Sequence, residues 1–381
     1  MTGSTTPRVL HILGELRPSG AEVMLRVAAP LWFAADRPHA ILATAEEEGP
    51  FADRLREAGY QVHHIRFSKT LRFFTDVYRL IRHGRFDAVH IHTERANLVY
   101  AIVARLAGTV RVVHTVHSAF EFTGGLRLVR KSMRAGLRLL GVAEVSVSLS
   151  VFDNEIRRFS NRTILIANWY DDKVFRRPTP EERVTARAVY GIDDGRPVLA
   201  TLGNCAPVKN HGVVLRAQQI LLRRRPDWFY LHAGGEDAKR AERALAAELG
   251  VGRRCAFLGY APEPISVLWA ADVFVMSSMR EGLGVAAIEA AACGLPLVLT
   301  DVPGLRDLKA VVSDAFWVRP EPAAIANAIE AAYVGYPSGS EGNASSVRAV
   351  FGVEAGASAY YGLYVGVAPP PARKLLAARS L

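Results

Sequence analysis

The chain has 381 residues, of which 50% are hydrophobic and 22% charged, and its formal net charge is +10. This length exceeds what one hydrophobic core usually serves, so two domains are expected. No apolar run is long enough to span a bilayer, and residues 1–7 lack the features of a secretory signal, which predicts a cytoplasmic protein. The positive charge favours anionic partners. No nucleic-acid-binding module is recognised, so lipid surfaces and nucleotide diphosphates are the better candidates.

In the first part of the chain, apolar runs alternate with amphipathic stretches, which predicts a doubly wound α/β domain over residues 1–170. Its strands are predicted at residues 9–13, 40–44, 62–65, 88–92, 111–116, 144–149 and 163–166. Its helices are predicted at residues 20–33, 51–58, 71–82, 97–106 and 126–140.

The proline-containing residues 171–197 interrupt the alternation and are interpreted as an interdomain connection with a short helix at 181–190. A second alternation over residues 198–335 predicts another doubly wound domain, with strands at 198–202, 228–233, 255–258, 273–276, 297–300 and 315–318. Residues 336–364 are expected to form a Gly/Ser-rich loop and a helix that returns to the first domain, and residues 365–381 a basic tail.

The most informative segment runs from Glu281 to Glu289, between two predicted strands of the second domain. Gly282 and Gly284 allow the backbone to approach a ligand closely. The helix that follows directs its positive end at this loop, where an anion is stabilised. Amides for a phosphate and carboxylates for hydroxyl groups suit a sugar nucleotide. The alternative is that the alanine-rich helix is an ordinary packing unit.

Other segments agree with this interpretation in order and spacing. In the second half they are LGNCAPVKNH at 202–211, AGGE at 233–236, FLGY at 257–260, AADVFV at 270–275 and TDVPGL at 300–305. In the first half they are SGAE at 19–22, VHIHT at 89–93 and HTVH at 114–117. Over residues 8–364 the chain resembles the family 4 retaining glycosyltransferases, which have the GT-B fold of two Rossmann-like domains facing an interdomain cleft.

The resemblance implies transfer of a sugar from a nucleotide diphosphate donor with retention of the anomeric configuration, without a cofactor or a metal, and a UDP-sugar is favoured over a GDP-sugar. By motif position Lys209 contacts the diphosphate, Glu289 the ribose hydroxyls and Glu281 the sugar hydroxyls. His117 matches the histidine beside the donor sugar, and Gly20 the glycine loop that faces the diphosphate. The loop residues that supply backbone amides are Gly282, Leu283, Gly284 and Val285.

The chain departs from the family pattern at Asn204, where an arginine is usual five residues before the loop lysine. One cation for the diphosphate is therefore lost, and a neutral hydrogen bond from Asn204 is about half as strong as a charge-assisted one. Arg8, Arg17 and Arg280 are candidates for compensation.

The histidine pairs and the cysteines are not expected to bind a metal. The pairs His90/His92 and His114/His117 have no adjacent cysteine or carboxylate cluster in the sequence, so they are expected to line a cleft. The three cysteines are far apart, have no zinc-binding spacing and are expected to be reduced packing residues. They are Cys205, Cys255 and Cys293.

Two predicted helices are basic and amphipathic. The helix from Leu126 to Leu140 carries cations at 127, 130, 131, 134 and 138, and the segment from Leu71 to Arg85 adds further arginines beside aromatic residues. Such helices bind anionic membrane surfaces, which predicts peripheral docking on the inner membrane leaflet. The alternative is a solvated helix face that packs on its own sheet.

The sequence thus predicts a cytoplasmic glycosyltransferase that acts on a glycan or lipid-linked acceptor in surface polysaccharide biosynthesis. One alternative is a GT-B sugar-nucleotide epimerase, which shares the fold and a phosphate-binding cleft. The other is a non-catalytic, nucleotide-binding subunit of a glycan assembly complex. The departure at Asn204 favours the last alternative, and the presence of Lys209, Glu281 and Glu289 argues against it.

Overall fold

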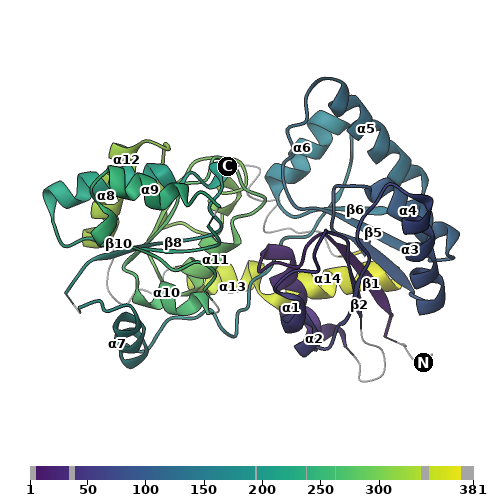
Figure 1. The fold of residues 1–381 in the computed structure, drawn as a ribbon, viewed down its shortest axis with the longest axis horizontal. Coiled ribbons are helices and arrows are strands. Elements are labelled where there is room, and N and C mark those ends of the chain that lie inside the picture. The colour runs from purple at the N-terminus through teal and green to yellow at the C-terminus, as the bar shows by residue number, and fades with distance from the viewer. Residues whose placement is uncertain are drawn as a thin grey trace. The chain divides into compact units, whose positions relative to one another are not determined.

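The computed structural model describes residues 6–33, 39–193, 195–236, 238–261, 263–335 and 343–369. The chain forms two compact units (Figure 1). Unit 1 comprises Met1–Trp169 and Val353–Leu381, and unit 2 comprises Tyr170–Gly352. Residues 336–342 of the predicted Gly/Ser-rich loop and residues 370–381 of the predicted tail lie outside the described residues.

Unit 1 contains a seven-stranded parallel sheet of order β3-β2-β1-β4-β5-β6-β7, which confirms the predicted doubly wound class. The strands are β1 (Val9–Leu13), β2 (Ala40–Ala43), β3 (Gln61–His64), β4 (Ala88–Ile91), β5 (Arg111–Val116), β6 (Ala143–Ser146) and β7 (Ile164–Leu165). The helices are α1 (Gly20–Trp32), α2 (Ala52–Glu57), α3 (Leu71–Gly84), α4 (Asn97–Leu106), α5 (Gly124–Leu139), α6 (Leu149–Phe159) and α14 (Val353–Val365). Every residue of β1, β2 and β4 is buried, as expected for strands that helices cover on both faces.

Helix α6 was not predicted, because the apolar run after residue 143 was assigned to a strand that continued to residue 149. The strand ends at Ser146, and Ser148 caps the helix by accepting a hydrogen bond of 3.2 Å from the Val151 amide. A local side-chain cap therefore decided between strand and helix here.

The C-terminal helix α14 completes unit 1. It contacts α1 and β5, and Figure 1 shows it in yellow beside α1. The Trp32 indole donates to the Ala357 carbonyl at 2.9 Å, and the Trp169 indole to the Met24 carbonyl at 3.1 Å. A Cβ at Gly356 would lie 2.3 Å from the Trp169 ring, so this helix needs glycine at its closest approach.

Unit 2 contains a six-stranded parallel sheet of order β10-β9-β8-β11-β12-β13. The strands are β8 (Val198–Leu202), β9 (Phe229–Ala233), β10 (Cys255–Phe257), β11 (Val273–Met276), β12 (Leu297–Thr300) and β13 (Phe316–Val318). The helices are α7 (Pro180–Val189), α8 (His211–Arg224), α9 (Ala241–Glu248), α10 (Pro264–Ala270), α11 (Val285–Ala292), α12 (Pro322–Gly335) and α13 (Ala344–Phe351), with 3-10 turns η1 (Pro207–Lys209), η2 (Gly252–Arg254) and η3 (Arg306–Leu308).

Two helices that the sequence analysis placed outside the second domain belong to unit 2. Helix α7 lies within the predicted interdomain connection, but it packs against α10. Helix α13 lies within the segment predicted to return to the first domain, but it contacts α11, and the residues assigned to unit 1 resume at Val353.

Strands β8 and β11 pair at the point where the strand order of unit 2 reverses. Ligands in open parallel sheets bind beyond the carboxyl ends of the strands at such a point. The loop after β8 carries Lys209, and the loop after β11 carries Glu281. The topology therefore brings the two predicted site segments to one edge of the sheet.

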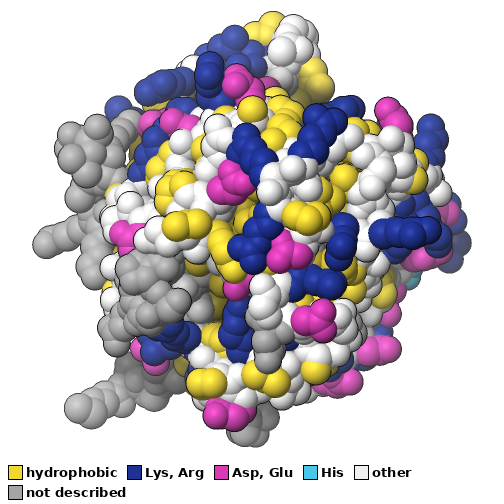
Figure 2. Space-filling model, turned by 90° about the vertical axis from the view of Figure 1, so that its left-hand side faces the viewer, with side chains coloured by type: hydrophobic (Ala, Val, Ile, Leu, Met, Phe, Trp, Pro, Cys, Tyr) yellow, Lys and Arg dark blue, Asp and Glu magenta, His cyan; other side chains and the backbone are white. Residues whose placement is uncertain are grey.

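Charged side chains of both signs lie on the face of the molecule that Figure 2 shows. Lys and Arg side chains are spread over that face, with Asp and Glu side chains among them. Among the helices of the described residues, none combines the length and the apolar character needed to cross a membrane.

Candidate active site

Lys209 and Glu281 form a direct ion pair in unit 2. The Lys209 Nζ lies 2.7 Å from Glu281 Oε1, and the two side chains are only 24% and 12% exposed. The Ser278 hydroxyl donates to the same Glu281 oxygen at 2.5 Å. The sequence assigned these residues separate ligand contacts, whereas the structure places their charged groups against each other.

The backbone holds both loops in place. The Met279 amide donates to the Val208 carbonyl at 2.8 Å, and the Ser277 hydroxyl to the Lys209 carbonyl at 3.0 Å. The Glu281 amide donates to the Pro303 carbonyl at 3.0 Å. A Cβ at Gly304 (φ +87°) would lie 2.2 Å from the Glu281 carbonyl oxygen, so the loop after β12 supports Glu281 at close range.

The glycine loop ends at Gly284, which has φ 72° and precedes the first residue of α11, Val285. Glycine has no side chain with which to cap the helix, and the Ala287 amide donates to the Gly284 carbonyl at 2.9 Å instead. Leu283 is 2% exposed and packs inside the unit, which leaves its backbone, not its side chain, for a ligand. A helix start of this kind favours an anion, and the anion site at this loop stays a prediction.

Glu289 lies in the second turn of α11. Burial, with a smaller contribution from the charge of Asp171, raises the pKa of Glu289 to about 8. The carboxyl group is therefore mostly protonated at neutral pH in the free protein. The protonated group can accept from a ribose hydroxyl through its carbonyl oxygen, whereas accepting at both oxygens as a carboxylate requires that it lose this proton.

The Asn204 side chain is held by the neighbouring strand end. Its Oδ1 accepts a hydrogen bond of 2.9 Å from the Gly235 amide. A Cβ at Gly234 would lie 1.9 Å from the Gly203 carbonyl oxygen, so the two loops touch through their backbones. Because Oδ1 is engaged, the Nδ2 group is the part of Asn204 that is suited to donate to a ligand.

In unit 1, Gly20 is the first residue of α1, and a Cβ added there would meet nothing within 4 Å. Packing within the chain therefore does not require glycine at this position. The Ser19 hydroxyl donates to the Glu22 carboxyl group, which is buried, and burial raises the pKa of Glu22 to about 7.

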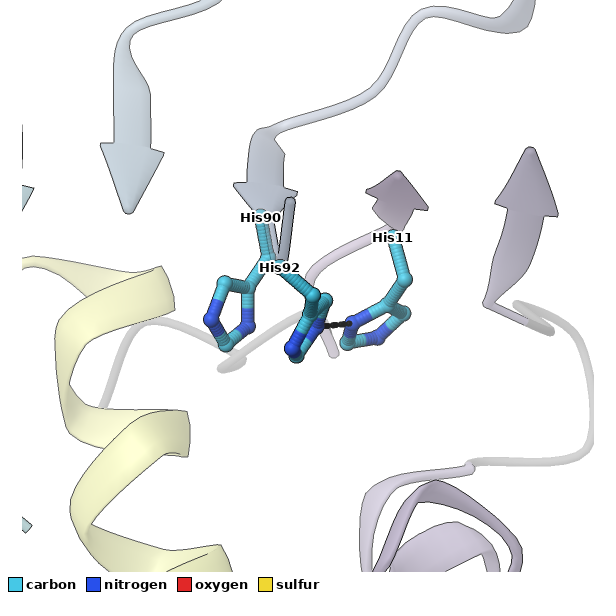
Figure 3. A group of neighbouring side chains, drawn as sticks. All are labelled: His11, His90 and His92. Atoms are coloured by element: carbon cyan, nitrogen blue, oxygen red, sulfur yellow. Dashed lines mark hydrogen bonds between the residues drawn. The ribbon is translucent and has the colours of Figure 1, made fainter. Parts of the chain in front are cut away.

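His117 follows β5 and belongs to a chain of four imidazoles. His117 Nε2 lies 3.2 Å from His92 Nδ1, His92 Nε2 lies 3.2 Å from His11 Nδ1, and His11 Nε2 lies 3.2 Å from His39 Nδ1. Figure 3 shows the contact between His11 and His92 beside His90. Burial, helped by the neighbouring His114, lowers the pKa of His117 to about 4, so His117 is neutral at physiological pH.

The predicted histidine pairs are divided differently in the structure. Both ring nitrogens of His90 are engaged, by the Tyr364 hydroxyl at 2.7 Å and the Thr115 hydroxyl at 2.8 Å. His114 instead faces carboxylates, with its Nδ1 3.5 Å from Glu144. Sequence reasoning did not single out His11 and His39, because each lies within or beside a buried apolar strand and has no motif of its own.

Two family models match the chain. Residues 9–152 match the model described as Glycosyltransferase Family 4, and residues 182–337 match the model described as Glycosyl transferases group 1. Among curated proteins, the Escherichia coli UDP-Gal:alpha-D-GlcNAc-diphosphoundecaprenol alpha-1,3-galactosyltransferase is 26% identical over 293 residues, which cover 72% of this chain and 74% of the relative. The putative glycosyltransferase EpsF of Bacillus subtilis is 27% identical over 316 residues, which cover 78% and 80%.

Among solved structures, HepE from Anabaena in complex with UDP and glucose superposes with a TM-score of 0.79 at 18% identity, covering 95% of this chain and 100% of that one. The two doubly wound sheets together with this match show the GT-B fold. The chain belongs to the family 4 glycosyltransferases, with a group 1 domain in its second half, as its motifs predicted.

Proposed function

We propose that this protein is a retaining glycosyltransferase that moves a sugar from a UDP-sugar to a glycan or lipid-linked acceptor in surface polysaccharide biosynthesis. The observation that carries the proposal is the Lys209–Glu281 pair beside the uncapped start of α11. One cation, the N-terminus of α11 and a carboxylate meet at the carboxyl ends of β8 and β11. These are the groups that a sugar with a diphosphate leaving group requires.

The chemistry follows from where charge develops. As the bond between the anomeric carbon and the phosphate oxygen breaks, negative charge gathers on the diphosphate, and fixed donors aimed at that charge are the main catalytic contribution. Lys209 and the α11 amides supply these donors in this proposal, while Glu281 holds sugar hydroxyl groups near the reacting carbon. The departing phosphate oxygen takes the acceptor proton on the same face of the sugar, so no protein base is needed.

The acceptor class is proposed from the relatives. The name of the E. coli relative specifies UDP-Gal as donor and a sugar on diphosphoundecaprenol as acceptor. HepE was solved with UDP and with UDP-glucose. We propose the same classes here, a uridine donor and a lipid-linked glycan acceptor reached from the cytoplasmic side of a membrane.

Donor choice is tested by thermal unfolding with UDP, GDP, ADP and their sugars. A ligand that binds only the folded state raises the melting temperature, and saturation at 100 times the Kd is worth about 2.7 kcal/mol. We expect the largest shift with UDP or a UDP-sugar. A larger shift with GDP or ADP contradicts the uridine assignment.

The site assignment is tested with Glu281→Ala, and Glu330→Ala on α12 serves as a control because that carboxylate pairs with Arg224 outside the site. We expect the Glu281 variant to lose most transfer and keep its UDP affinity, and the control to match wild type. Wild-type turnover by Glu281→Ala overturns the assignment. Epimerised donor without acceptor indicates an epimerase, and bound nucleotide without turnover a non-catalytic subunit.

A further inference from the structure

A second cluster of metal-ligating side chains lies in unit 2. Cys205 is in the loop after β8, His211 is the first residue of α8, and His232 lies in β9. One ligand atom from each of the three lies within 4.8 Å of the others. The Glu242 carboxylate, from the first turn of α9, lies 3.7 Å from His211 Nδ1 and also faces Cys205.

Two distances among these four side chains are those of neighbouring ligands in a tetrahedral zinc site. Zinc bonds of roughly 2.0–2.3 Å to nitrogen, oxygen and sulfur place neighbouring ligand atoms about 3.3–3.8 Å apart. Cys205 Sγ and His232 Nε2 are 3.3 Å apart, and His211 Nδ1 and Glu242 Oε1 are 3.7 Å apart. Thiolate and imidazole together favour zinc among the common divalent ions.

The imidazoles of His232 and His211 have different surroundings, and both are suited to bind a metal ion. His232 Nδ1 lies 2.8 Å from the Thr201 hydroxyl, which also contacts the Tyr230 hydroxyl at 2.8 Å. Such a hydrogen bond at one nitrogen fixes the ring and leaves the other nitrogen for a metal. His211 is 4% exposed, and its buried Nδ1 faces the Glu242 carboxylate at 3.7 Å, which is longer than an ordinary hydrogen bond. A metal ion bound between these two groups would satisfy both of them.

This cluster is better suited to bind a divalent ion than the group of three histidines in unit 1, His11, His90 and His92, because it contains groups that can carry negative charge. A divalent ion among those neutral rings would bring two uncompensated charges into the core of unit 1, where the groups acting on His11 are burial and other histidines. In the unit 2 cluster one thiolate and one carboxylate balance a divalent ion. We propose that unit 2 binds one Zn²⁺ ion through Cys205, His211, His232 and Glu242.

The site has a structural consequence for the loop that carries Lys209. Cys205 and His211 stand at the two ends of this loop, and η1 (Pro207–Lys209) lies between them. A zinc ion that binds both ends restricts the loop and holds the backbone beneath the Lys209 ammonium. Cys205 is half-buried.

The test is metal content after loading and desalting. The protein expressed with added Zn²⁺ should retain about one equivalent by elemental analysis. Co²⁺ should bind the metal-free protein and give the charge-transfer absorption of a thiolate ligand. Cys205→Ser should lower Zn²⁺ affinity by more than about 100-fold, beyond the usual cost of losing a hydrogen-bond partner of a ligand. Cys255→Ser, which removes the other half-buried thiol, is the matched control and should leave binding unchanged.

Circular dichroism and thermal unfolding in EDTA show whether Cys205→Ser remains folded. If it does not fold, Glu242→Gln replaces it, since the amide keeps the shape of this carboxylate, which is 13% exposed. A loss of at least tenfold in Zn²⁺ affinity is expected. Less than a tenth of an equivalent of zinc in the wild type overturns the proposal. Equal zinc content in the wild type, Cys205→Ser and Glu242→Gln overturns it as well, because the ion then binds elsewhere.

Discussion

At the scale of single residues, the structure changes how Lys209 and Glu281 are understood. The two side chains neutralise each other in the free protein, at 2.7 Å. A donor diphosphate must share Lys209 with Glu281 or replace it, which makes the carboxylate a competitor as well as a proposed sugar contact. Loss of Glu281 therefore leaves a cation available, which is why we expect nucleotide affinity to survive in Glu281→Ala.

Glu289 gives a pH-dependent prediction. Its pKa is raised to about 8 by burial, so binding as a carboxylate to ribose hydroxyls must release a proton near neutral pH. UDP affinity should then rise about tenfold per pH unit below pH 8 and level off above it. Isothermal titration calorimetry in buffers of different ionisation enthalpy measures the released proton directly.

The control is Glu289→Gln, which should bind UDP without this dependence on pH. Glu289→Ala should weaken binding by about 1–3 kcal/mol, the usual cost of losing a buried hydrogen-bond partner. An affinity that falls above pH 8 contradicts the assignment, because the protonated acid would then be the binding form. The same raised pKa means that the native state holds more protons than the unfolded state between pH 4.5 and about 8, so stability falls as pH rises through that window.

At the scale of elements, only some of the cations of helix α5 lie on the exposed basic face that their spacing in the sequence predicts. Arg134 is fully buried, and its guanidinium donates to both oxygens of Glu155 at 2.5 and 2.9 Å and to Glu94 at 3.0 Å. Arg130 is also engaged, by the Glu94 carbonyl at 2.9 Å. Helical spacing places residues on a face, but it does not show that α6 supplies a buried carboxylate to that face.

Replacing Arg134 should destabilise unit 1 strongly. In Arg134→Ala, Glu155 is left buried without its cation, and removing one partner of a buried pair costs about 3–5 kcal/mol. Lys131→Ala on the same helix is the control, because that side chain is exposed and its loss should stay within about 0.5 kcal/mol. Urea unfolding followed by circular dichroism measures both variants, and equal stabilities contradict the structural role of Arg134.

Membrane docking by α5 and α3 stays a prediction, and the structure identifies the side chains that test it. Leu126, Leu128 and Val129 are 51%, 67% and 55% exposed beside the exposed cations Arg127 and Lys131. Exposed apolar and basic side chains on one helix suit an anionic lipid surface.

The protein should cosediment with anionic liposomes at physiological salt, and the double change of Leu128 and Val129 to Asp should abolish binding. Val184→Asp, which alters a similarly exposed residue on α7 in unit 2, should leave binding intact. Equal recovery with neutral liposomes contradicts docking, because an electrostatic contribution is then absent.

At the scale of the whole molecule, the two units are built differently along the chain. Unit 2 is one continuous segment, whereas unit 1 needs α14 from the far end of the sequence. Tyr360 and Tyr364 on α14 are almost fully buried and contact Thr115 and His90 through their hydroxyl groups. Unit 1 therefore cannot be completed until α14 is present.

A chain that ends at Gly352 should lose the folded structure of unit 1 and keep nucleotide binding by unit 2. The fluorescence of the buried Trp32 and Trp169 reports on unit 1, and calorimetric titration with UDP reports on unit 2. A chain that ends at Pro369 is the control and should keep both properties. Loss of UDP binding together with unit 1 contradicts the assignment of the nucleotide site to unit 2 alone.

The sequence by itself determined the fold class, most element positions and the segments that carry the candidate site. Buried parallel strands are continuous apolar runs and can be recognised within a short segment. The loops at 202–211 and 281–289 contain glycines and charged residues that can likewise be recognised without knowing what lies near them in the fold. The tertiary structure decided which side chains meet. Lys209 pairs with Glu281 over 72 positions, and Arg134 with Glu155 over 21. Cys205, His211 and His232 come together because the carboxyl ends of parallel strands lie at one edge of the sheet. The order in which the strands pair cannot be predicted from any single segment of the sequence.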